Sequence, residues 1–344
     1  SLPRRKPMIM LATLGERLPF LVLGLLLLFQ PGLPPATLLA IFFALYAVQT
    51  FSGGVAMTAW QDFIARLIPS RRWGTFFGLN FGLGGVLGVA GAAVATATLA
   101  SQPFPQNFGI LALICFSAQV VSYCFLSSTI EPPQPAAPRQ PMGAFLGSIG
   151  PLLGRNAMFR RYLFCRGAIA LGLTGHSFLT AAAIERFNSS AADIGLFTAV
   201  LLGMQAAAHL GLGALADRWG HKQVLELSTA MGLLALLLAY LAPTVSWFLP
   251  IFALVGAAQA GYQLSGFTLV FSFSSPSERP AYIGVSNTEL MPVAALGPLL
   301  AGWLAEVTSY GALFIALMSV GVIGLLGLHW RVAAPVRPAP SGSD

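Results

Sequence analysis

Charged residues are scarce in this sequence. Only 8% of its 344 residues are Asp, Glu, Lys or Arg, whereas a soluble domain carries about 25%. Hydrophobic residues make up 56% of the chain, so a soluble fold would have too few polar residues to cover its surface. The composition therefore excludes an ordinary soluble protein and predicts one whose surface meets lipid.

Motifs for nucleotide hydrolysis and for common hydrolases are also missing. The sequence holds no Walker loop, no His-Glu-x-x-His and no Gly-x-Ser-x-Gly, so it does not support an ATP-driven pump or a familiar intramembrane hydrolase. Its three cysteines, Cys115, Cys124 and Cys165, lie inside apolar segments without metal-ligand spacing. We expect them to be reduced packing residues. The sequence thus predicts no metal, no cofactor and no enzymatic activity.

Long apolar runs, by contrast, fill most of the chain. A membrane-spanning helix needs about 20 mostly apolar residues, and ten segments meet this requirement. Because the bilayer offers no partner to unpaired backbone groups, we predict an all-α membrane protein. The predicted spans are residues 8–29, 37–59, 74–99, 107–128, 161–184, 194–215, 223–242, 247–272, 281–305 and 310–330.

The basic residues gather on alternate loops. One side of the predicted spans carries almost all of them, and the other side has only Arg186. The positive-inside rule places the basic side, and with it both ends of the chain, in the cytoplasm. The net charge of +7 therefore reflects membrane topology rather than nucleic-acid binding. We expect a multi-pass protein of the plasma or inner membrane, with the lipid bilayer as its main partner. The basic side holds Arg4, Arg5, Lys6, Arg66, Arg71, Arg72, Arg139, Arg155, Arg160, Arg161, Arg218, Lys222, Arg279, Arg331 and Arg337.

One connection is much longer than the others. Residues 131–160 begin with a stretch rich in proline, alanine and glutamine, which predicts a flexible cytoplasmic linker. The predicted domains are a bundle of four spans at 1–130, this linker, a bundle of six spans at 161–330 and a cytoplasmic tail at 331–344. The two bundles look like parallel repeats, and we expect the first to have lost two spans.

The sharpest motif runs from Gly213 to Leu225. These thirteen residues fit the pattern G-x-L-A-D-R-x-G-x-K-x-x-L at every fixed position. The motif resembles the cytoplasmic loop of the major facilitator superfamily, where it joins spans two and three and, in weaker form, spans eight and nine. By this counting the chain holds family spans three to twelve and lacks the first two.

The resemblance implies a two-bundle helical transporter of the major facilitator type that works as a secondary carrier. In such carriers, alternating access rocks one half against the other around a central site. We therefore expect a monomer that moves a small-molecule solute across the membrane. Two other classes stay open: a membrane enzyme that acts on lipids, and a non-transporting relative that serves as a sensor or partner-binding subunit.

Three residues of the motif have a clear physical role in its backbone. Gly213 allows close approach between helices, and Gly220 allows a tight turn. Asp217, near a helix end, can accept hydrogen bonds from the start of a neighbouring helix. The motif is expected to control the conformation of the carrier rather than to bind solute.

The basic residues of the motif complete this picture. Arg218 and Lys222 hold the loop on the cytoplasmic side, and we expect them to pair with acids there, such as Glu278 or Asp62. The alternative is an ordinary charged turn, which agreement along the whole pattern disfavours.

Glu289 is the most prominent acid inside a predicted span. It lies eight residues from the start of its span at residue 281, a depth of about 12 Å. An ionised carboxylate is costly at that depth, so the neutral form is favoured and a proton can be exchanged. We hypothesise that Glu289 couples transport to protons. A structural acid bonded to a neighbouring helix is the alternative.

Two stripes of polar and small residues share helix faces at spacings of three and four. The resemblance makes their helices the family's spans four and ten, which line the central cavity, so it implies that both stripes line the substrate cavity. Hydrogen bonding between helices is the alternative. The stripes are Tyr46, Gln49 and Gly53 on the second span, and Gln259, Tyr262 and Gln263 on the eighth.

The span at 161–184 carries two further polar residues. His176 lies near the middle of the membrane, on what the resemblance makes another cavity helix, and joins the candidate cavity residues. Arg166 lies about one turn inside the span, from where its long side chain is expected to reach back to the cytoplasmic surface.

Overall fold

The structure, a computed structural model, describes residues 4–131, 142–275 and 278–333. Within these ranges the chain forms helices and no strand. It divides into two compact units. Unit 1 combines Ser1–Pro69 with Leu87–Gln140, and unit 2 combines Ser70–Val86 with Pro141–Asp344.

Ten helical segments of the described chain are long and apolar enough to cross a membrane. This number confirms the prediction of an all-α, multi-pass membrane protein. The α-helices are α1 (Lys6–Phe29), α2 (Pro35–Leu67), α3 (Trp73–Ser101), α4 (Gln106–Ser128), α5 (Met142–Arg155), α6 (Ala157–Leu173), α7 (Leu179–Phe187), α8 (Ala191–Trp219), α9 (His221–Leu241), α10 (Phe248–Thr268), α11 (Arg279–Val307) and α12 (Tyr310–Arg331). Short 3-10 segments are η1 (Ser70–Arg72), η2 (Thr174–Phe178), η3 (Val245–Trp247) and η4 (Leu269–Phe273).

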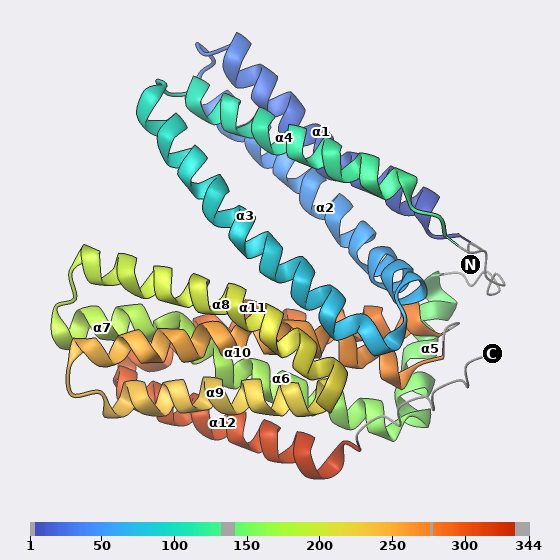
Figure 1. Ribbon diagram of the computed structural model, residues 1–344, viewed down its shortest axis with the longest axis vertical. Coiled ribbons are helices and arrows are strands. Elements are labelled where there is room, and N and C mark those ends of the chain that lie inside the picture. Colours follow the sequence, from blue (N-terminus) through green and yellow to red (C-terminus); the bar gives the residue numbers. More distant parts are fainter. Residues whose placement is uncertain (1–3, 132–141, 276–277, 334–344) are drawn as a thin grey trace. The chain divides into compact units, whose positions relative to one another are not determined.

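Unit 1 is built around α1. This helix packs against both α2 and α4, which lie beside it in Figure 1. Ile9 and Leu27 of α1 are buried, as are Phe63 of α2 and Ala112 of α4. One buried stripe thus holds the unit together.

Unit 2 is built around α10 and α12. In Figure 1, α10 lies against α8 and α9, and α12 packs against α6 and α9. The core between them is apolar and includes Leu236, Phe248, Phe252 and Phe314. These helices carry the loop motif and most of the candidate site residues.

Large apolar side chains are also exposed along the spans. Leu11, Phe125, Phe164 and Leu299 each expose more than half of their surface. Such exposure is unusual in water and ordinary in lipid, where backbone groups are paired inside the helix and the side chains meet acyl chains. The exposed apolar surface is consistent with the membrane prediction.

Two spans differ most from the prediction. The second runs to Leu67 instead of residue 59. The fifth is interrupted by η2, so that α6 ends at Leu173 and α7 begins at Leu179. Thr174 assists the break, because its hydroxyl donates to the carbonyl of Ala170 within the last turn of α6. A 3-10 segment of this kind commonly marks a hinge or a functional site.

The segment predicted as a linker holds a helix of its own. Residues 132–141 lie outside the described residues, but α5 then forms over Met142–Arg155. Asn156 separates it from α6, and its side chain accepts a hydrogen bond from the backbone N–H of Phe159 at the start of α6. This is ordinary N-capping.

Arg186, the one basic residue on its side of the predicted spans, has a structural role. Its guanidinium donates to the carbonyls of Ala239 (2.7 Å) and Ala242 (3.0 Å) at the end of α9. The last carbonyls of a helix lack partners within the helix, and a cation is favourable there. The exception to the charge pattern is therefore a helix cap.

Candidate functional site

The loop motif joins α8 to α9 through Gly220. This residue ends α8, donating its N–H to the carbonyl of Ala216, and α9 begins at His221. Gly220 has φ 112° and ψ 152°, a conformation that is essentially restricted to glycine. The tight turn expected of this glycine is confirmed.

Gly213 lies where α8 touches the beginning of α3. A Cβ at Gly213 would come within 2.5 Å of the carbonyl oxygen of Gly74 and 2.9 Å of the Cα of Gly78. Real Cβ atoms essentially never approach other atoms so closely, so the two backbones can meet here only through glycine. The close approach expected of Gly213 is confirmed.

Asp217 uses the same contact to cap α3. Its Oδ1 accepts the backbone N–H of Gly74 at 2.7 Å, and its Oδ2 accepts both the backbone N–H (2.7 Å) and the hydroxyl (2.5 Å) of Thr75. A carboxylate at a helix N-terminus satisfies unpaired N–H groups and complements the helix dipole. The expected hydrogen bonding of Asp217 is confirmed, and the helix it caps is α3.

The prediction that Lys222 pairs with an acid is confirmed, but that acid is neither Glu278 nor Asp62. Its ammonium lies 3.4 Å from the carboxylate of Glu226 one turn along α9, and it donates to the carbonyl of His329 on α12 at 3.0 Å. The two acids expected to pair with it have other partners. Asp62 pairs with Arg5 and Arg66, and Glu278 pairs with Arg155. Lys222 therefore joins α9 to α12.

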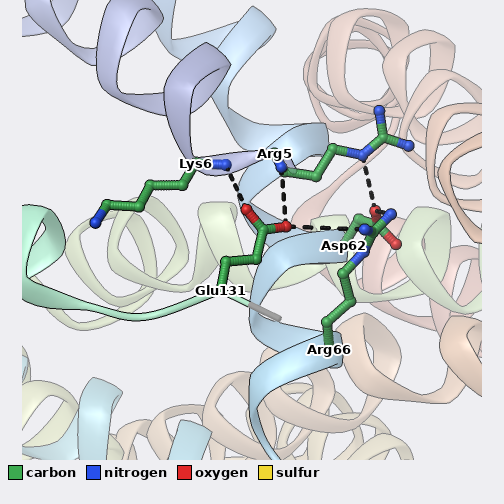
Figure 2. Close-up of polar contacts among 5 residues, drawn as sticks. All are labelled: Arg5, Lys6, Asp62, Arg66 and Glu131. Carbon is green, nitrogen blue, oxygen red and sulfur yellow. Dashed lines mark hydrogen bonds and ion pairs between the residues drawn. The ribbon is translucent and has the colours of Figure 1, made fainter. Parts of the chain in front are cut away.

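A second charged cluster lies within unit 1. Figure 2 shows five residues from the start of α1, the end of α2 and the segment after α4: Arg5, Lys6, Asp62, Arg66 and Glu131. Glu131 is only 5% exposed, and its two oxygens accept the backbone N–H groups of Arg5 and Lys6, each at 2.8 Å. It caps α1 as Asp217 caps α3.

Asp62 holds the basic side chains of this cluster. It is fully buried, and its Oδ2 lies 2.5 Å from Arg66 and 3.1 Å from Arg5. Sequence reasoning missed this cluster because it assigned Glu131 to the linker. The spacing of Asp62 and Arg66 by four residues was a usable signal, since such pairs face each other on a helix.

The α2 stripe lies over α1. Tyr46 and Gln49 line a cavity of about 50 Å³ with Pro19 and other apolar residues of the two helices. Such a volume holds a few water molecules rather than a solute. Gly53 faces the carboxylate of Glu16, whose Oε1 would lie 2.9 Å from a Cβ at that position.

The three residues of the α10 stripe have different surroundings in the structure. The amide oxygen of Gln259 accepts a bond from Gln205 of α8 at 3.4 Å, which is the helix–helix role named as the alternative. Gln263 is exposed and Tyr262 is partly buried. The Tyr262 hydroxyl is buried within hydrogen-bonding reach of Arg166.

Glu289 and His176 interact with different residues. His176 lies in η2, where its Nε2 is 3.0 Å from the carbonyl oxygen of Gly232 on α9. Glu289 instead interacts electrostatically with Arg166 of α6, and one of its oxygens is buried without a hydrogen-bond partner.

Arg166 is the residue that sequence reasoning placed wrongly. It was expected to reach the cytoplasmic surface, but it is only 7% exposed. Its Nη1 donates to the carbonyl of Ser286 at 3.1 Å and to the hydroxyl of the same residue. An arginine within an apolar run is a usable signal, because a buried charge in a span is rare without a function.

Within the described ranges, no three His, Cys, Asp or Glu residues are grouped as a metal site would need.

Comparison with protein families decides the class of the molecule. A family model described as "Major Facilitator Superfamily" matches residues 162–344, more than half of the chain. The chain belongs to the major facilitator superfamily. The resemblance drawn from the loop motif is thereby confirmed.

Two curated proteins are similar to part of the chain. A methylenomycin A resistance protein of Streptomyces coelicolor is 28% identical over 123 residues, which is 36% of this chain and 26% of the relative. A thioclapurine efflux transporter of Claviceps purpurea is 29% identical over 148 residues, which is 42% of this chain and 27% of the relative. The matches thus span well under half of each relative.

Solved structures of major facilitator proteins share the fold over nearly all of the chain. The human organic anion transporter MFSD10 has a TM-score of 0.72 and 18% identity, covering 94% of this chain and 77% of that one. The fucose:proton symporter FucP of E. coli has a TM-score of 0.75 and 12% identity, with 96% and 84% covered. At these identities the likeness is one of fold.

Proposed function

We propose that this protein is a secondary carrier that moves a small solute across the membrane by alternating access. The match of residues 162–344 to the major facilitator superfamily carries the proposal. The names of the two curated relatives, one for resistance to methylenomycin A and one for efflux of thioclapurine, support a small organic solute. The carrier works as a monomer and catalyses no chemical reaction.

Reconstitution with a mixture of candidate solutes tests this proposal. The purified protein is placed in liposomes, which are incubated with a small-molecule extract of cells and then analysed by mass spectrometry. At least one solute should equilibrate or accumulate inside faster than in protein-free liposomes. If no solute differs between the two preparations, the protein is not a carrier, and a sensor or partner-binding role takes its place.

A lipid-modifying enzyme is the second class to weigh. Such an enzyme needs its acid, base or metal ligands gathered at one membrane interface. The polar groups of Arg166, Tyr262 and Glu289 lie instead well inside their helices, about 14 Å from the start of α6 for Arg166 and about 15 Å from the start of α11 for Glu289 at 1.5 Å per residue. This depth favours a solute path over an interfacial active site.

The charge pattern leads to a proposal about orientation. Both ends of the described chain face the cytoplasm in a plasma or inner membrane, and the loop at Asn188–Ser190 faces outward. With the three native cysteines replaced by serine, an impermeant thiol reagent added to intact cells should label Ser189→Cys and spare Gly154→Cys, which lies on α5. After the cells are opened, both positions should react. The reverse pattern in intact cells would show that the orientation is inverted.

We further propose that Glu289 binds and releases a coupling proton. In liposomes with an imposed pH gradient, Glu289→Gln should abolish accumulation of the solute but leave exchange without a gradient near the level of the unmodified protein. Glutamine keeps the shape and hydrogen bonding of the protonated acid, so binding survives while proton release is lost. The measurement is solute content over time in both modes.

A matched control separates this effect from general damage. Glu185 is exposed on α7, so Glu185→Gln removes the same charge without touching the buried cluster and should leave pH-driven accumulation intact. Accumulation by Glu289→Gln against the solute's own gradient would show that this residue is not the proton carrier.

A further inference from the structure

Arg166 of α6 is a buried cation with an unused donor. Its Nη1 donates hydrogen bonds to the carbonyl and the hydroxyl of Ser286 on α11. Its Nε is buried and has no hydrogen-bond partner. Leaving a buried charged donor without an acceptor is costly. The unpaired Nε of Arg166 can therefore donate a hydrogen bond to an acceptor atom of a ligand.

Two other buried polar atoms belong to the same neighbourhood. Oε2 of Glu289 on α11 is buried without a hydrogen-bond partner. The Tyr262 hydroxyl of α10 is buried within hydrogen-bonding reach of Arg166, and its own O–H is left free to donate. Both residues interact electrostatically with Arg166. Yet Arg166 and Glu289 are not among the ion pairs formed by the described residues. We call Arg166, Tyr262 and Glu289 the arginine cluster.

Glycines lie on two sides of the arginine cluster. A Cβ at Gly167 would come within 2.5 Å of Oε1 of Glu289, so a larger residue there would push the carboxylate away from its present position. Gly266 on α10 faces the guanidinium, and a Cβ at that position would lie 3.8 Å from Nε of Arg166. Gly167 thus lets the Glu289 carboxylate lie close to α6, and Gly266 places no side chain between α10 and the guanidinium.

The charges of the cluster balance only while Glu289 is ionised. Once its carboxylate is protonated, Arg166 becomes a buried cation without a countercharge, which is costly in a low-dielectric surrounding. The Nε edge of a guanidinium binds a carboxylate through two parallel hydrogen bonds, and a phenol hydroxyl can donate a third. An incoming anion would therefore satisfy the charge and the unpaired donors together.

We propose that Arg166 and Tyr262 bind a carboxylate group of the transported solute, and that this solute is an organic anion. The inference rests on the proposed function in that the bound anion is the carrier's solute. Protonation of Glu289 and binding of the anion then favour each other, because each removes the electrostatic cost of the other. Solute and proton enter the site with no net charge added to it.

Binding to the purified full chain tests the inference without transport. The probes are benzoate and benzamide, which share a ring and a planar head group but differ in charge. The readout is the shift of the thermal unfolding midpoint with probe concentration, since a ligand of the native state raises that midpoint. Benzoate should stabilise the protein, and benzamide should not.

The variants assign the binding to the cluster. Glu289→Gln mimics the protonated acid and should bind benzoate about tenfold more tightly, whereas Arg166→Gln should abolish the benzoate shift. Arg186→Gln is the control, because it removes an arginine of the same unit that caps α9, and it should keep the shift. If Arg166→Gln does not unfold cooperatively, Tyr262→Phe replaces it, with binding expected to be several-fold weaker.

Several results would overturn the inference. These are equal shifts with benzoate and benzamide, no benzoate shift in Glu289→Gln, or an unchanged shift in both Arg166→Gln and Tyr262→Phe. Failure of the liposome experiment with benzoate binding intact would instead contradict the carrier function and leave the anion site standing.

Discussion

Gly213→Val is expected to cost about 3 kcal/mol or more in stability, the upper part of the range for overpacking. The valine Cβ would meet the carbonyl oxygen of Gly74 and the Cα of Gly78. Both are backbone atoms of α3, so no rotation of a side chain can relieve the clash. The two helices must separate, which also removes the hydrogen bonds of Asp217 to the start of α3. The measurement is thermal unfolding of the detergent-solubilised protein.

The same helix offers a matched control. Gly211, two residues earlier in α8, has open space where its Cβ would lie. Gly211→Val therefore introduces the same β-branched residue into the same helix without a clash, and its effect should stay within about 1 kcal/mol. Equal losses in the two variants would mean that valine in α8, rather than the contact with α3, is responsible.

Asp217→Asn is expected to lower the initial rate of transport about tenfold while leaving solute affinity nearly unchanged. The carboxylate receives three donors at the start of α3: two backbone N–H groups and the Thr75 hydroxyl. Asparagine keeps the shape but replaces one acceptor oxygen with a donor NH₂, which faces these donors. Hydrogen bonds to a charged group contribute about 1.5–3 kcal/mol, and 1.4 kcal/mol corresponds to a factor of ten in rate.

The rate should fall without a loss of solute affinity because of where Asp217 lies. Asp217 contacts only α3 in these bonds, so its loss changes the stability of one conformation rather than the solute site. Asp193 is the control, because it caps the other end of the same helix through a local bond to Ser190. Asp193→Asn should leave the rate intact. Loss of solute binding with normal conformational cycling in Asp217→Asn would contradict a role in conformational control.

The spans could be predicted because the signal for each lies within about 20 consecutive residues. The last span was predicted at 310–330 and is found at Tyr310–Arg331. The second was predicted to end eight residues too early, because Asp62 and Arg66 in its last turns look like loop residues. Their charges neutralise each other inside the unit, which hydropathy cannot reveal. The break at η2 was also missed, since a few residues of 3-10 helix leave an apolar run apolar.

In the candidate site, too, features set by neighbouring residues could be predicted, whereas contacts between residues far apart in the chain could not. The turn at Gly220 and the capping role of Asp217 could be predicted, because both follow from the loop motif itself. The partner of Asp217 is 143 residues away in the chain, and that of Arg166 is 120 residues away. A single sequence gives no register between such distant helices, so Arg166 was placed by its apparent depth alone and assigned to the surface.

The cap that Glu131 places on α1 has a consequence for how unit 1 is made. The residue accepts the N–H groups of Arg5 and Lys6 across 126 and 125 positions of chain. At about 5–20 residues per second, a ribosome needs roughly 6–25 s to reach Glu131 after it has made the start of α1. Throughout that interval the first turn of α1 has no carboxylate to satisfy its donors. The N-terminal cap of α1 therefore forms only after α4 and Glu131 have been synthesised. Three further spans, α2, α3 and α4, are made between α1 and the residue that caps it.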